Sequence, residues 1–185
     1  MSVNELVGYY GKNSKLIGHC TREESELKNY TIANVIIFIF NSSGQVWLQK
    51  RSKNKKHYPG LFDTSACGAI AYGEKPAVAA QREQKEEMGF NCKLHFTRRF
   101  LNSFPDETNS LTRTRLSYIY VGISDDQPIT NHEVEEFASF PYEEIYLESI
   151  KHPKKFVPSM SKELAIAIKK YNQLALAVGG DSSDY

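Results

Sequence analysis

Short apolar runs of strand length dominate the first half of the chain. The longest covers residues 35–40, and the turn 41–44 separates it from a second strand-like segment at 45–50. This pattern predicts a β-hairpin whose first strand is buried. A shorter hairpin is expected at the start, where residues 9–10 and 16–17 flank a polar turn.

Helix signals interrupt these strands at two places. Thr21 and Glu24 have the spacing of a capping box, which predicts a helix of about two turns. Between Pro76 and Gly89 lies an alanine-rich, charged segment of good helix formers. Proline suits the first position of a helix and glycine its end, so a helix is predicted there, after strand-like pieces within 63–71.

The second half continues with both kinds of element. Strands are expected at 94–104 and 113–123, joined by the loop 105–111, and a strand at 135–140 precedes a short helix from Tyr142. A last helix at 161–178 places these residues on one apolar face: Leu164, Ile168, Tyr171, Ala175 and Val178. The order of elements predicts an α+β fold with helices packed on a central sheet.

Length and composition indicate one globular domain. The 185 residues are 41% hydrophobic, no repeat or long linker divides them, and a single domain over 1–180 with a disordered tail at 181–185 is expected. The net charge of +1 shows no basic excess, which argues against a general nucleic-acid binder.

Cysteine usage and the apolar runs bear on the compartment. Cys20, Cys67 and Cys92 are odd in number and lack zinc-site spacing, which indicates a reducing environment. The N-terminal residues contain no apolar signal core, and the run 35–40 is too short to span a bilayer. A cytoplasmic protein is expected.

The most informative segment is acidic. On a helix, Glu83, Glu86 and Glu87 stand at i, i+3 and i+4, so their carboxylates share one face. Like charges at this spacing repel unless a cation joins them, and Mg²⁺ or Mn²⁺ prefers oxygen ligands. An exposed charged face is the alternative for an arbitrary helix. Glu74, just before the helix, is placed to pair with Arg82 or accept N-terminal amides.

This segment resembles the Nudix box. The residues that match the family pattern at the required spacing are Gly68, Glu74, Arg82, Glu83, Glu86, Glu87 and Gly89. The resemblance implies a Nudix fold, in which a curved mixed sheet lies between helices, and a divalent metal held by the glutamates and the main-chain carbonyl near Gly68. Gln84 departs from the pattern, because the family places an apolar residue there; it either weakens packing or has a hydrogen-bond partner.

The resemblance extends to the branch related to isopentenyl diphosphate isomerase. That branch has a catalytic cysteine, which corresponds to Cys67, and metal-binding histidines, where this chain has Ala69 and a residue near Ile32. Without those imidazoles the isomerase metal cage cannot be built in the same way. Cys67 is therefore expected to be a small buried hydrophobe.

The function implied is metal-dependent hydrolysis of a diphosphate linkage in a nucleoside diphosphate linked to another group, or in a similar organic diphosphate. Arg82 would orient the carboxylates, and the general base is a glutamate of the box or of the segment 133–136. Arg51, Tyr58 and Phe62 are candidate substrate contacts, although Arg51 equally suits a surface ion pair. An isomerase and a non-catalytic nucleotide-sensing module are the alternatives, and a homodimer is possible.

Overall fold

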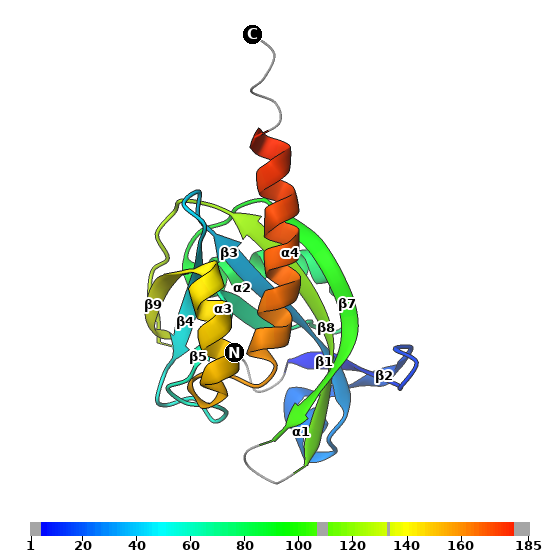
Figure 1. The fold of residues 1–185 in the computed structure, drawn as a ribbon. Helices are drawn as coiled ribbons and strands as arrows, with labels where there is room; N and C mark the ends of the chain where they lie inside the picture. The colour runs from blue at the N-terminus through cyan, green and yellow to red at the C-terminus, as the bar shows by residue number, and fades with distance from the viewer. Residues whose placement is uncertain (1–4, 107–110, 133, 180–185) are drawn as a thin grey trace.

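Nine strands form one mixed sheet in the computed structural model, which describes residues 5–106, 111–132 and 134–179 (Figure 1). The strands are β1 (Leu6–Tyr10), β2 (Leu16–Thr21), β3 (Thr31–Phe40), β4 (Gln45–Arg51), β5 (Phe62–Asp63), β6 (Ala66–Ala69), β7 (Leu94–Pro105), β8 (Thr112–Ile123) and β9 (Val134–Pro141). The helices are α1 (Arg22–Leu27), α2 (Pro76–Met88), α3 (Tyr142–Lys151) and α4 (Met160–Gly179), with a 3-10 turn at Pro153–Lys155.

Strand β3 is the centre of this sheet. It pairs in parallel with β8, and antiparallel with β6, β1 and β4. Its apolar run is buried on both faces, as expected for a strand covered by helices on each side. The strand begins at Thr31, four residues before the predicted start, because the polar Asn34 lies within it and faces a pocket rather than solvent.

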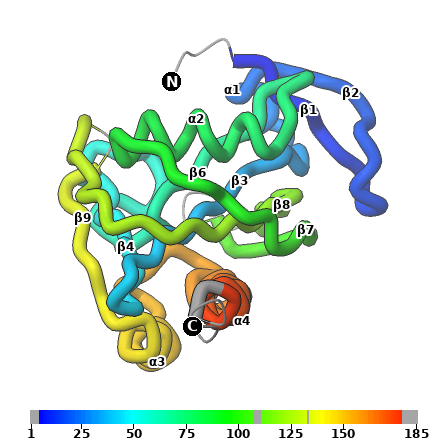
Figure 2. The backbone as a smooth tube through the Cα atoms, turned by 90° about the horizontal axis from the view of Figure 1, so that it is seen from above, coloured from blue at the N-terminus to red at the C-terminus, as the bar shows by residue number. Residues whose placement is uncertain are grey.

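Helices cover both faces of the sheet, which confirms the predicted α/β/α arrangement (Figure 2). On one face α3 and α4 pack against alternate residues of β3, among them Ile36, Phe38 and Phe40. On the other face α2 packs its alanines against Val35 and Ile37. The alternation along a strand explains why successive residues of β3 belong to different core clusters.

The predicted face of α4 is wrong toward its C-terminal end. Leu164 and Tyr171 are buried as expected, and Ile168 packs at the edge of the core. Ala175, however, is exposed, and the side chain of Val178 is outside the described residues. The helix runs past the edge of the sheet (Figure 1), so its last turns have no apolar surface to cover.

Other predicted features can be compared directly. The capping of α1 is confirmed, since Thr21 Oγ1 accepts a hydrogen bond from the Glu24 amide at 3.1 Å, while the Glu24 carboxylate bonds Lys28. Both predicted hairpins are present. Residues 107–110 of the predicted loop, Glu133 and the expected tail 181–185 lie outside the described residues.

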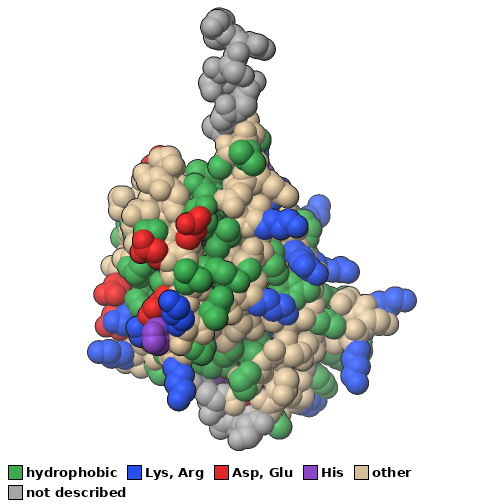
Figure 3. All heavy atoms as spheres, viewed as in Figure 1, with side chains coloured by type: hydrophobic (Ala, Val, Ile, Leu, Met, Phe, Trp, Pro, Cys, Tyr) green, Lys and Arg blue, Asp and Glu red, His purple; other side chains and the backbone are tan. Residues whose placement is uncertain are grey.

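Surface composition adds two findings. Within the described ranges, every helix is too short or too polar to cross a bilayer. On the face that carries α3 and α4, the side chains toward β7 are basic, while acidic and basic side chains lie together toward α3 (Figure 3).

Gln84 packs inside the core with its amide satisfied. It is 0% exposed, its Oε1 accepts from the Cys92 amide at 3.3 Å, and its Nε2 donates to the Cys92 sulfur at 3.1 Å. The hydrogen-bond partner that the sequence left as an alternative is therefore present, and Gln84 ties α2 to the segment that follows it.

We expect Gln84→Ala to lower the free energy of unfolding by about 3 kcal/mol, because it leaves a cavity and removes the acceptor of a backbone amide. Urea denaturation measures this change. Gln81→Ala, at an exposed position of the same helix, is the control and should change stability by less than about 0.5 kcal/mol. Equal effects of the two substitutions would contradict the assigned role of Gln84.

Candidate active site

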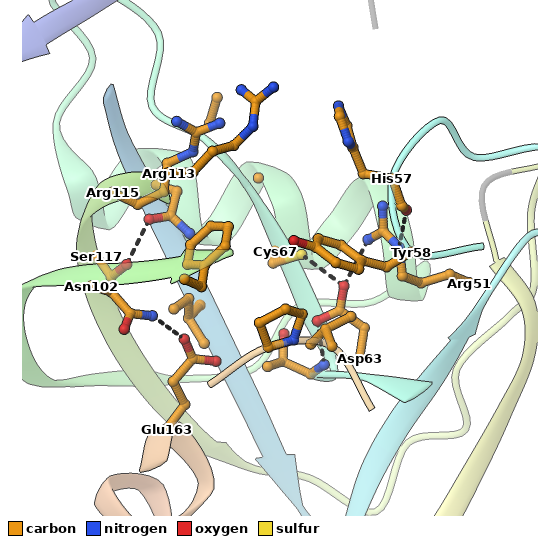
Figure 4. A pocket seen from close by; sticks show the side chains of 18 of the residues that line it. Arg51, His57, Tyr58, Asp63, Cys67, Asn102, Arg113, Arg115, Ser117 and Glu163 are labelled. Carbon is orange, nitrogen blue, oxygen red and sulfur yellow. Dashed lines mark hydrogen bonds and ion pairs between the residues drawn. The ribbon is translucent and has the colours of Figure 1, made fainter. Parts of the chain in front are cut away.

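A pocket opens where β3, β6, β7 and β8 meet the loop after β4 and the start of α4 (Figure 4). Gly68 and Glu87 form part of its wall on the α2 side, and Arg113 and Arg115 form part of the wall on β8. The pocket thus joins an acidic helix to a basic strand.

The carboxylates of α2 differ sharply in exposure. Glu83 is 3% and Glu87 is 6% exposed, whereas the side chain of Glu86 is 57% exposed. Glu87 Oε2 accepts hydrogen bonds from the Cys67 amide and from Gln49 Nε2, both at 2.9 Å. These contacts fix Glu87 against β6, so the simple charged-face alternative does not describe Glu83 or Glu87.

Gly68 lets α2 approach β6 closely. A Cβ atom added at Gly68 would overlap the carboxylate of Glu83. The glycine is therefore required by the short separation between strand and carboxylate. It also places the main chain of β6 beside the acidic face.

Arg82 links the residues around this face. Its guanidinium bonds both oxygens of Glu74, at 3.0 and 2.9 Å, and donates to the Ala69 carbonyl at 3.1 Å. It also contacts Glu83 at 2.7 Å and Glu86 at 3.3 Å. These bonds raise the pKa of Arg82, so the residue stays charged and orients the two glutamates.

Burial dominates the electrostatics of the two inner glutamates. Desolvation raises the pKa of Glu83 to about 7 although Arg82 opposes the shift, and it raises the pKa of Glu87 to about 8. Ionising both groups therefore needs a compensating positive charge.

The donor set suits a hard divalent cation, since it consists of carboxylate oxygens beside a main-chain strand. Within the described residues, no three acidic, histidine or cysteine side chains already converge as a complete metal site. Arg82 holds Glu83 and Glu86 instead, so a cation would compete with this arginine for them.

Arg51 lies on the pocket wall with its charge paired. Its guanidinium bonds Asp63 at 2.7 Å and the carbonyl of His57 at 3.1 Å. Of the two alternatives for Arg51, the ion pair is present, but inside the pocket rather than on the surface.

The two aromatic residues predicted to contact substrate lie in different places. Tyr58 lines the pocket, and its hydroxyl donates to the Pro105 carbonyl at 2.6 Å. Phe62 does not line it, because its ring packs against Phe140 and Phe156 at centroid distances of 5.6 and 6.0 Å.

Cys67 is half-buried and faces the pocket, so its description as a buried core residue needs correction. Its sulfur lies 3.6 Å from Asp63 Oδ2. Burial, followed by repulsion from the neighbouring carboxylates, raises the pKa of this thiol well above its usual range. The thiol is therefore protonated at neutral pH and is a poor nucleophile.

Glu135 and Glu136 lie apart from the pocket. Glu135 is within 3.8 Å of Lys50 and 4.0 Å of Lys53, and it does not line the pocket. Glu136 is exposed near Lys50. A surface charge cluster accounts for both residues.

The sequence did not reveal several polar residues that line the pocket. Glu163 is 5% exposed and accepts a hydrogen bond from Asn102 Nδ2 at 2.6 Å. Asn102, Arg115 and Ser117 occupy inward positions of β7 and β8. The available signal was polar residues at strand positions where alternation predicts apolar ones.

Burial raises the pKa of Glu163 to about 8, and Asp63 adds a smaller contribution in the same direction. The folded protein binds this proton more tightly than the unfolded chain does. The contribution of Glu163 to the free energy of unfolding is therefore fully present below the unfolded pKa of about 4.5. It falls by about 1.4 kcal/mol per pH unit as the pH rises toward 8. We expect the free energy of unfolding of Glu163→Gln, measured by urea denaturation, to increase relative to that of the wild type between pH 6 and pH 8. A constant difference between the two proteins would contradict this.

Comparison with known proteins is consistent with these features. The NUDIX domain profile matches residues 31–160. The chain is 33% identical over 146 residues, 78% of its length and 79% of the relative's, to isopentenyl-diphosphate Delta-isomerase of Pectobacterium atrosepticum. It is 45% identical over 64 residues, 35% of this chain and 38% of the other, to an uncharacterized Nudix hydrolase of Listeria innocua.

Among solved structures, DR0079 from Deinococcus radiodurans has the same fold, with a TM-score of 0.72 and 22% identity over 88% of this chain and 99% of that one. The profile match, which includes α2 and most of the sheet, carries the assignment to a family. The chain belongs to the Nudix family, in a branch related to isopentenyl-diphosphate isomerase.

Proposed function

We propose that the protein hydrolyses a diphosphate bond in an organic diphosphate, with a divalent cation held by Glu83, Glu86 and Glu87 and the carbonyl near Gly68. The observation that carries this proposal is the burial of Glu83 and Glu87 against β6, at the edge of a pocket whose other wall is basic. A diphosphate is the kind of ligand that needs both a cation and basic side chains.

The residues around the cation have separate roles. When bound, Mg²⁺ or Mn²⁺ neutralises diphosphate oxygens and activates water. Gln49 and the Cys67 amide hold Glu87 in place, while Arg82 and Glu74 orient Glu83 and Glu86. One carboxylate of α2 accepts the proton that the attacking water loses.

An isomerase is the second candidate, because relatives are named isopentenyl-diphosphate Delta-isomerase. The pocket favours hydrolysis. The resemblance places histidines of that branch at Ala69 and near Ile32. Ile32 and Ala69 line the pocket, and among the described residues His57 is the only histidine on its wall.

Phosphate or pyrophosphate release, measured with Mg²⁺ and with Mn²⁺, tests the proposal. The substrates are nucleoside diphosphate sugars, dinucleoside polyphosphates, dinucleotides and coenzyme A. Metal-dependent release that EDTA abolishes is the expected result. Formation of dimethylallyl diphosphate from isopentenyl diphosphate, followed by NMR, would replace the proposal by isomerisation. Tight binding of these compounds without turnover would instead favour a nucleotide-sensing module.

A further inference from the structure

Arg113 and Arg115 lie next to one another on one side of the pocket, across from Arg51 and Tyr58 (Figure 4). They are alternate residues of β8, so both side chains project from the same face of the sheet. None of the box residues contributes to this end of the pocket.

Arg113 is buried with part of its charge unsatisfied. The residue is 6% exposed, and its Nε donates to Asp106. Its Nη1 is buried and has no hydrogen-bond partner in the described part of the chain. A buried donor without a partner is unfavourable, and its presence in a pocket points to a ligand.

Arg115 adds a second cation at the same place. In the part of the chain that the structure describes, its half-buried side chain makes no hydrogen bond or ion pair. Burial, followed by repulsion from Arg113 and Arg22, lowers the pKa of Arg115 to about 10. Glu26 and Asp106 act in the opposite direction, but their contributions are smaller and do not cancel this shift.

Arg113 and Arg115 line the same pocket as Gly68 and Glu87 but lie at a distance from them. Arg115 of β8 pairs with Ile32 of β3, and Gly68 of β6 pairs with Val35 on the other side of β3. Arg115 and Gly68 are therefore two strand spacings and three residues apart, a distance on the order of 10–15 Å. Asn34 and Ser117, joined by a hydrogen bond of 2.8 Å, line the pocket between them. A ligand with two anionic groups at this separation can reach both ends.

We propose that Arg113 and Arg115 bind a second phosphate group of the substrate, distinct from the diphosphate that is cleaved. A guanidinium group donates two parallel hydrogen bonds to a phosphate group. A buried phosphate would accept a hydrogen bond from Arg113 Nη1 and would offset the charge of Arg115. The inference rests on the proposed hydrolase function. It assigns the substrate to diphosphates that also carry a phosphate ester, as coenzyme A and NADPH do.

Metal-free binding tests the site without reference to catalysis. Inorganic phosphate is titrated in EDTA, with calorimetry and thermal melting as readouts. We expect wild-type protein to bind, Arg115→Gln to lose at least tenfold in affinity, and Arg115→Lys to recover part of it. Arg98→Gln, which removes an exposed arginine of β7, is the matched control and should bind as the wild type does.

The same melting experiment shows whether the variant is folded. Because Arg115 makes no hydrogen bond or ion pair with the described residues, ligand-free Arg115→Gln should melt at or above the wild-type temperature. Absence of phosphate binding to the wild type, or equal affinity in Arg115→Gln, would overturn the proposal. A lower melting temperature with phosphate affinity retained would assign Arg115 to fold stability and also overturn it.

Substrate pairs that differ by one phosphate test whether the two arginines affect turnover. Coenzyme A is compared with dephospho-coenzyme A, and NADPH with NADH, since each pair differs by one phosphate. We expect kcat/KM to favour the phosphorylated member by at least tenfold in the wild type and the ratio to approach one in Arg115→Gln. An unchanged ratio contradicts the assignment. If no diphosphate is hydrolysed, the proposed function fails, while the metal-free titration still decides whether the arginines bind phosphate.

Discussion

Glu87→Gln is expected to lower metal-dependent turnover by at least about a hundredfold while the fold is retained. The substitution removes the negative charge but keeps an oxygen that can accept the hydrogen bonds from the Cys67 amide and Gln49. Since burial already raises the pKa of Glu87 to about 8, loss of the carboxylate removes a charge that the interior tolerates poorly. The metal-free variant should therefore be at least as stable as the wild type at pH 8.

Glu83→Gln should behave in the same way, because Glu83 is equally buried on the same face. Initial rates at saturating Mg²⁺ and urea denaturation measure the two effects. Glu143→Gln, at an exposed position of α3, controls for removal of a negative charge. Near-normal rates in folded Glu83→Gln and Glu87→Gln proteins would reject the assignment of these residues to the metal.

Gly68→Ala is expected to impair both stability and turnover. The new methyl group would occupy the position of the Glu83 carboxylate, so either β6 or Glu83 must move. Overpacking of this kind costs about 1–3 kcal/mol. The displaced carboxylate leaves Arg82, and turnover should fall by about a hundredfold, as for other misplaced catalytic groups.

A double variant separates the two effects. Glu83→Asp shortens the side chain and makes room for the methyl group, so Gly68→Ala with Glu83→Asp should recover stability relative to Gly68→Ala alone. Its turnover should stay low, because the aspartate cannot reach the same position. Stability losses that simply add would show that Gly68 and Glu83 are not in contact.

The elements that the sequence predicted well are those specified by local pattern. Thr21 caps α1, Pro76 begins α2, and Gly89, with a φ of 83°, ends it. The acidic face of α2 follows from helical spacing alone, once the segment is known to be a helix. Neighbouring residues decide these features, so no tertiary information is needed.

Features that depend on distant contacts were not predicted. The burial of Arg51 with Asp63 requires β4 and β5 to pair, and the pairing of Glu163 with Asn102 joins α4 to β7. The exposure of Ala175 depends on where the sheet ends beneath α4. Helical periodicity continues through Ala175 whether or not a sheet lies beneath it.

Binding of Mn²⁺ to the purified protein, followed by titration calorimetry, tests the central claim most directly. The account predicts saturable uptake by the wild type and by Glu143→Gln, and at least a tenfold loss of affinity in Glu83→Gln and in Glu87→Gln. Undetectable uptake by the wild type, even with a nucleoside diphosphate present, or equal uptake by all four proteins, would contradict it.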